Sequence, residues 1–178
     1  ALSCKDDDEK PASQVTFGTE ATSLKSAIFV KAGSSDDSRD GGTHYQHSVL
    51  LLGDGLTVDG DNIAGKGNVL VLNINSPDIT LTTGTYTYTY EEDNSGWNAF
   101  EMRSAYFYVG STQGGSSDEG YALSQATLKV SKSGDKYSFS LTGTAYPEDS
   151  WNYSPDTTQP STSIKADFTG NVRTISAK

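Results

Sequence analysis

Two tryptophans and one tyrosine are the side chains of this chain whose types and spacing best suit binding chemistry. Trp97, Trp151 and Tyr153 lie in stretches rich in Asn, Asp, Ser and Gly. Flat aromatic faces beside amide and carboxylate groups suit sugar rings, because the rings contact C–H faces while the polar groups bond the hydroxyls. Trp and Tyr are also typical anchors for protein partners. The structural alternative is that each tryptophan covers one end of the fold.

A second aromatic feature is a stripe of tyrosines. Tyr86, Tyr88 and Tyr90 alternate with threonines, so on a strand the three rings would share one face. Such a stripe either forms a binding surface or packs in the core and pairs across strands. The sequence leaves both interpretations open.

Residues suited to metal ions are few. Asp59 and Asp61 flank Gly60, and calcium favours clustered carboxylates on tight loops. A structural calcium at this turn is the only cofactor the sequence predicts, although acids in Gly-rich loops often act only as turn formers. His44 and His47 are three positions apart, which on a strand directs them to opposite faces rather than to one ion.

Groups for catalysis are not arranged in a recognisable way. The chain lacks a Gly-x-Ser-x-Gly motif, and the order of its Ser, His and Asp residues does not indicate a triad. Glycoside hydrolysis needs two carboxyl groups facing each other across a cleft. Glu101 and Glu148, with the loop acids Glu91 and Glu92, are the best candidates, but sequence cannot place any two face to face. We therefore expect a binding protein rather than an enzyme.

The elements that must position these residues are β-strands. In the stretch 124–143 apolar and polar residues alternate on both sides of Gly134-Asp135, which is typical of a hairpin with one buried face. Similar runs recur without any helical period, so we predict an all-β fold of about 8–10 strands. The favoured form is an antiparallel β-sandwich, and the alternative is a β-barrel. Further strands are expected at 14–18, 24–30, 45–52, 68–76, 81–90, 99–109 and 164–169.

Composition and charge limit the classes of partner that this chain is expected to bind. The chain has 178 residues, a formal net charge of −10 and a sequence pI of about 4.5. Phosphate backbones and anionic membrane surfaces would repel it, so we expect no nucleic-acid partner and no membrane contact except through a covalent anchor. We expect residues 1–12 to form a flexible tether and residues 13–178 to form a single domain.

The N-terminal residues resemble those of an exported lipoprotein. Cys4 follows small and apolar residues and precedes Lys5-Asp6-Asp7-Asp8, an order similar to the lipidated Cys and acidic export tract of Bacteroidota surface lipoproteins. This resemblance implies a secretory signal peptide, lipidation at Cys4 and an outer-membrane, cell-surface location. Two acyl chains would give stable anchoring. The alternatives are a protease-site tag or an ordinary flexible terminus.

These observations lead to one functional expectation and one rival. The segments 81–88 and 164–171 are similar to those of uncharacterised secreted β-domains of the same bacteria, a group without an assigned activity. We expect a lipid-anchored cell-surface protein that binds a glycan or a neighbouring envelope protein through Trp97, Trp151 and Tyr153. The rival is a structural subunit of a pilus-like or matrix-like assembly, which would pair through an exposed strand edge.

Overall fold

The computed structural model describes residues 13–35, 41–90, 97–112 and 115–176, and within these ranges it contains strands and no helix. The all-β prediction is therefore confirmed. None of the described segments is a helix that could cross a membrane. The strands are β1 (Gln14–Phe17), β2 (Glu20–Ser35), β3 (His44–Gly53), β4 (Leu56–Asp59), β5 (Asn62–Ser76), β6 (Gly84–Thr89), β7 (Met102–Thr112), β8 (Glu119–Ser133), β9 (Lys136–Pro147), β10 (Thr162–Gly170) and β11 (Val172–Ser176).

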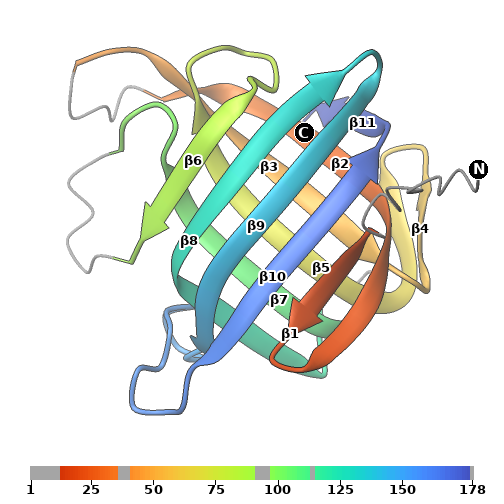
Figure 1. The fold of residues 1–178 in the computed structure, drawn as a ribbon, viewed down its shortest axis with the longest axis vertical. Helices are drawn as coiled ribbons and strands as arrows, with labels where there is room; N and C mark the ends of the chain where they lie inside the picture. Colours follow the sequence, from red (N-terminus) through yellow and green to blue (C-terminus); the bar gives the residue numbers. More distant parts are fainter. Residues whose placement is uncertain (1–12, 36–40, 91–96, 113–114, 177–178) are drawn as a thin grey trace, which may run out of the picture.

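The sheet closes into a barrel, which is the alternative of the two predicted architectures. Eight antiparallel strands follow the order β1-β10-β9-β8-β7-β5-β3-β2, and β1 also pairs with β2. That last pairing joins the two ends of the sheet and removes its edges. β8, β9 and β10 are neighbours in the sheet and form an antiparallel meander. In Figure 1 these three strands lie in front and cross the direction of β2, β3, β5 and β7 behind them.

Of the three strands outside the barrel, two extra strands, β6 and β11, fill places where barrel neighbours diverge. β7 pairs with only the first part of β8, from Glu119 to Ala122, and β6 pairs with β8 from Gln125 to Val130. β1 pairs with β2 at Glu20–Ser23, and β11 runs parallel to β2 at Ala27–Lys31. Each extra strand therefore continues a wall that its neighbour leaves open. This arrangement gives the closed sheet two crossed halves, which explains why the sequence pattern is compatible with a sandwich.

The barrel interior is packed with side chains. The inward positions of the strands form one hydrophobic cluster, with Leu70, Leu128 and Leu141 fully buried at its centre. The tyrosine stripe belongs to this core, because Tyr86 and Tyr88 are buried and Tyr90 packs against them half-buried. The Tyr86 hydroxyl donates a hydrogen bond to the Thr82 carbonyl at 2.8 Å, which satisfies its polar end. Of the two interpretations of the stripe, the structural one is correct.

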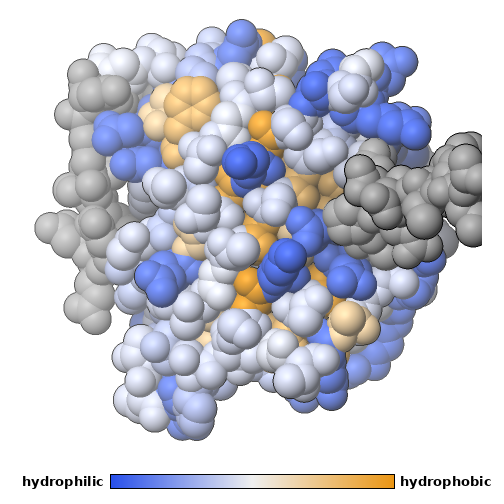
Figure 2. Space-filling model, in the orientation of Figure 1, coloured by the Kyte–Doolittle hydropathy of each residue, from blue (hydrophilic) through white to orange (hydrophobic). Residues whose placement is uncertain are grey.

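The two halves of the barrel differ on the outside. The outer positions of β8, β9 and β10 are mostly Thr, Ser and Lys, and the face in Figure 2 is mainly pale and blue with small orange areas. The outer positions of β2, β3 and β5 carry a second apolar cluster that includes Ile28, Leu52 and Val69. The hairpin of β4 and the start of β5 covers this cluster with Leu56. The closed wall and the covered outer face leave the loops at the two barrel ends as the main places for recognition.

Candidate binding site at the β9–β10 loop

The loop between β9 and β10 presents the two most exposed aromatic residues among the large apolar side chains that the structure describes. Trp151 is 92% exposed and Tyr153 is 64% exposed. A tryptophan in water forgoes the stabilisation that burial of its ring would give, so an almost free indole makes this loop a candidate for binding. Of the two interpretations that the sequence leaves open for Trp151, a surface position in the loop is the one that the structure shows.

Hydrogen bonds hold the loop in one shape. The backbone N–H of Trp151 donates to Asp149 Oδ1 at 2.9 Å, and the backbone N–H of Tyr153 donates to the Asp149 carbonyl at 2.9 Å. The Asp149 N–H in turn donates to the Ser154 carbonyl at 2.8 Å, and the Ser154 hydroxyl donates to Asn152 Oδ1 at 2.6 Å. A ligand that binds such a loop immobilises few additional rotatable bonds of the protein, which lowers the entropic cost of binding.

The backbone of Tyr153 has an uncommon conformation. Its φ is 56°, in the left-handed region that non-glycine residues rarely adopt. Such a residue costs free energy unless its surroundings hold it there, and such residues are frequent at ligand sites. The neighbouring Asp149 and Ser154 contacts hold this turn, and the buried Pro155 pairs with Glu148 as an isolated bridge beneath it.

An acid and a stacked pair of tyrosines form the floor of this site. Tyr108 of β7 donates a hydrogen bond from its hydroxyl to Glu148 Oε1 at 3.4 Å. The Tyr106 and Tyr108 rings stack on the outer face of β7 with centroids 5.9 Å apart. Gly120 allows Glu148 to lie here, because a Cβ at that position would come within 2.5 Å of Glu148 Oε2. Tyr106 and Tyr108 are not among the binding residues predicted from the sequence. Their alternate spacing, which on a strand puts both rings on one face, was the only sequence feature that indicated this pair.

Burial changes the acidity of this floor. Burial raises the pKa of the Glu148 carboxyl, and the hydrogen bond from Tyr108 offsets part of that shift. Burial, followed by the negative charge of Glu148, also raises the pKa of Tyr108. A smaller contribution to the raised Tyr108 pKa comes from Tyr153 of the same loop. The site offers flat apolar faces together with carboxylate and amide oxygens.

Trp97 lies apart from this site. It precedes β7, and the Arg103 guanidinium stacks over its ring at 4.1 Å from the centroid. Tyr108, which borders the loop site, lies five residues beyond Arg103 along β7. At about 3.3 Å per residue of extended strand, this separation is about 16 Å. Of the three predicted binding residues, the structure brings Trp151 and Tyr153 together and places Trp97 near the other end of β7.

Of the candidate carboxylates, the two that the structure describes, Glu101 and Glu148, do not face each other. Glu101 precedes β7 and accepts the Asn98 N–H at 2.7 Å, whereas Glu148 contacts Tyr108 further along that strand. Glycosidases need their two carboxyl groups within about 5–10 Å. Seven residues of extended strand from Glu101 to Tyr108 span about 23 Å, so this pair does not fit that chemistry. Glu91 and Glu92 lie outside the described residues, as does Cys4.

The predicted calcium residues occupy a hairpin turn. Asp59 ends β4, Gly60 has a φ of 59°, and Asp61 precedes β5, so all three have a turn-forming role. In the described ranges no three His, Cys, Asp or Glu side chains gather in a way that could hold an ion. His44 and His47 are both buried on β3 and point to opposite faces, as their spacing requires. A calcium ion at Asp59 and Asp61 stays a prediction.

Several buried polar atoms have no hydrogen-bond partner among the residues that the structure describes. Both ring nitrogens of His44, both amide atoms of Asn75 and Oδ1 of Asn98 are in this state. Phe100, two residues after Asn98 in sequence, has a φ of 64°. Unpaired buried polar groups cost roughly 1–3 kcal/mol each. An asparagine within the aliphatic run of β5 was the only sign of this feature in the sequence.

Comparisons with protein families, with curated proteins and with solved structures find no match to this chain.

Proposed function

We propose that this protein is a lipid-anchored cell-surface binding protein that recognises an uncharged glycan through the β9–β10 loop. The observation that carries the proposal is the indole of Trp151, which is 92% exposed on a loop held by its own hydrogen bonds. Tyr153 adds a second exposed ring two residues away. An aromatic face in this setting can cover the C–H face of a sugar, while Asn152 and Asp149 bond its hydroxyls.

Charge supports an uncharged ligand. The loop contains the acids Glu148, Asp149 and Asp156 and no Lys or Arg, and the whole chain has a net charge of −10. An acidic polysaccharide would meet repulsion on approach, and nucleic acid would meet more. A neutral glycan can use the carboxylates as hydrogen-bond acceptors for its hydroxyls.

The test is binding to a glycan array followed by titration of the best ligand. We expect Trp151→Ala to abolish binding and Tyr153→Ala to weaken it about tenfold or more, which corresponds to about 1.4 kcal/mol. Trp97→Ala is the matched control, because it removes the other tryptophan from a separate place on the fold. Loss of binding only in Trp97→Ala would overturn the proposal, as would capture of an envelope protein but no glycan through Trp151.

The anchor is a separate part of the proposal with its own test. Metabolic labelling with a fatty-acid analogue in a bacterial host should tag the chain expressed with a lipoprotein signal, and Cys4→Ser should remove the tag and release the protein from membranes. Labelling that survives Cys4→Ser would contradict a lipid anchor at this residue. Glycan binding by the domain does not depend on this result.

The assembly alternative has one supporting observation. β11 pairs with β2, and β4 pairs with β5; no second strand neighbour of either is described. A further strand could add there, although closure of the barrel removes the longer edges. Concentration-dependent oligomers on size exclusion would favour this alternative, and a monomer at all concentrations would contradict it.

A further inference from the structure

The barrel end opposite the β9–β10 loop contains a pocket of about 180 Å³. Inward-facing residues at the ends of β2, β9 and β11 form its walls, and the segment from Ile79 to Leu81 closes one side. The mouth of a β-barrel is a common place for a small ligand. The lining residues are Phe29, Lys31, Ile79, Thr80, Leu81, Tyr137, Val172 and Thr174.

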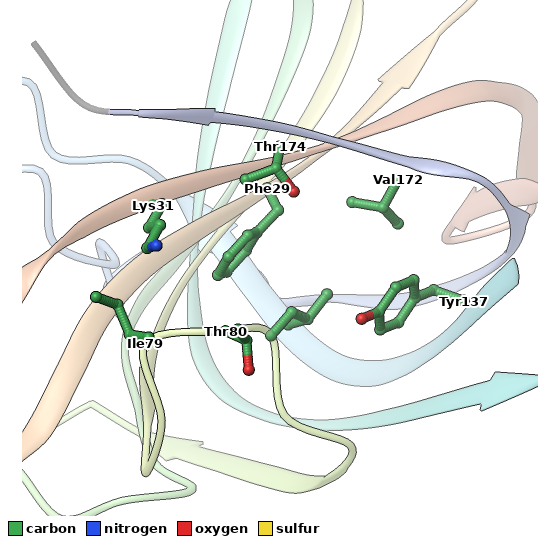
Figure 3. Close-up of a pocket in the computed structure, with 8 residues that line it drawn as sticks. Phe29, Lys31, Ile79, Thr80, Tyr137, Val172 and Thr174 are labelled. Carbon is green, nitrogen blue, oxygen red and sulfur yellow. The ribbon is translucent and has the colours of Figure 1, made fainter. Parts of the chain in front are cut away.

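The pocket combines an apolar floor with a polar rim. Phe29 and Leu81 are buried and belong to the barrel core, so they form a fixed apolar base. Figure 3 shows Lys31 and Tyr137 on opposite sides, with the Tyr137 hydroxyl directed into the space between them. A ligand there would contact apolar groups below and one cation and one hydroxyl near the opening.

Two lysines lie at this end of the barrel. Lys31 takes part in none of the ion pairs found among the described side chains. The Lys132 ammonium lies 4.9 Å from the centre of the Tyr137 ring, which brings a second cation to the same rim. Asp78, next to the Ile79–Leu81 segment, accepts the Thr80 N–H at 3.3 Å within its own turn. His47 lies behind Phe29, with ring centroids 4.6 Å apart, and burial lowers the pKa of its imidazole.

We propose that this pocket binds a small carboxylate with one aromatic ring or a short aliphatic tail. The carboxylate accepts a hydrogen bond from the Lys31 ammonium, the apolar part lies against Phe29, Leu81 and Val172, and the Tyr137 hydroxyl bounds the far side of the space. The volume sets the size of the ligand, since an apolar cavity of roughly 150 Å³ is enough for benzene. A charge-assisted hydrogen bond beside an apolar wall is stronger than the same bond in water.

The probes that test this site are benzoate and hexanoate, each compared with its uncharged alcohol, benzyl alcohol or hexan-1-ol. Titration is followed by amide NMR of the ¹⁵N-labelled protein. We expect the carboxylates to shift the resonances of Thr80, Leu81 and Thr174 and to bind about tenfold more tightly than the alcohols. Equal affinity for acid and alcohol would overturn the proposal, as would shifts confined to the β9–β10 loop or no shift at 20 mM probe.

Two variants test the Lys31 charge and the volume of the pocket separately. Lys31→Met keeps most of the stem and removes the charge, so we expect it to weaken carboxylate binding about tenfold or more and to leave alcohol binding unchanged. Thr174→Phe fills the pocket from β11 and should abolish binding of all four probes. Lys129→Met, on the exposed outer face of β8, is the matched control and should bind as the wild type does. Unchanged carboxylate binding in both Lys31→Met and Thr174→Phe would overturn the proposal.

Discussion

Replacement of Trp151 by alanine should remove binding with almost no loss of stability. Burial of a whole Trp side chain removes roughly 150–250 Å² from water. Trp151 is 92% exposed, so the loop buries less than a tenth of that area, or about 20 Å². At about 25 cal/mol per Å² the expected loss in the free energy of unfolding is about 0.5 kcal/mol. In a domain of this size the change in Tm is about 1–2 °C.

Two comparison variants give this value a scale. Trp97 is half-buried and stacks with Arg103 at 4.1 Å, so Trp97→Ala should cost about 1–2 kcal/mol. Phe139 is 1% exposed in the barrel core, so Phe139→Ala should cost about 3–5 kcal/mol. The predicted order of destabilisation is therefore Phe139→Ala, then Trp97→Ala, then Trp151→Ala.

Thermal unfolding by circular dichroism and glycan titration on the same preparations provide the assay. If the Trp151 indole is a free recognition residue, Trp151→Ala is the least destabilising of the three variants and also the one that loses binding. A fall in Tm of more than about 5 °C for Trp151→Ala would show that the indole packs against the protein in solution. The ring would then not be free for a ligand, and the loop would lose its place as the recognition site.

Three further predictions concern buried polar groups. Glu148→Gln should stabilise the protein at pH values above 4.5, the ordinary pKa of this carboxyl, and not below it. Burial raises the Glu148 pKa, so the wild-type protein loses stability as this group ionises with rising pH. Measurement of Tm between pH 3 and pH 8 checks this prediction. Asn75→Leu should be neutral or raise the free energy of unfolding by about 1 kcal/mol in urea titration, because both amide atoms are buried and unpaired; a loss above 2 kcal/mol would contradict this. Tyr86→Phe should cost about 1–2 kcal/mol in the same titration, since the Thr82 carbonyl loses its donor, and an unchanged midpoint would show that water replaces the hydroxyl.

Much of the fold is predictable because strand periodicity is a local property. The alternation in 124–143 predicts the β8–β9 hairpin, and Ser133 pairs with Lys136 across Gly134 as that pattern requires. Closure of the barrel is not local. It depends on β1 pairing with both β10 and β2, so residues near 15 meet residues near 22 and 166, and alternation alone does not distinguish this from two separate sheets.

The candidate site was predictable in part for the same reason. Trp151 and Tyr153 are close in sequence and lie in a polar loop, so their exposure and proximity follow from local composition. Tyr108 reaches Glu148 across 40 positions, and Lys31 of β2 lies across the pocket from Tyr137 of β9, two strands far apart in the sequence. Contacts of this kind depend on the order of strands in the sheet, which is not readable from periodicity.

The strand β11 gives one end of this barrel a feature of its own. Where β11 continues the wall beside β2, Val172 and Thr174 complete a pocket whose floor is the core itself. The proposed glycan site is at the other end, where the β9–β10 loop presents the exposed rings of Trp151 and Tyr153. A pocket suits a ligand that is enclosed, and protruding rings suit a large surface that the protein only touches. The carboxylate probes and the glycan titrations should therefore report independent sites, with each unaffected by saturation of the other.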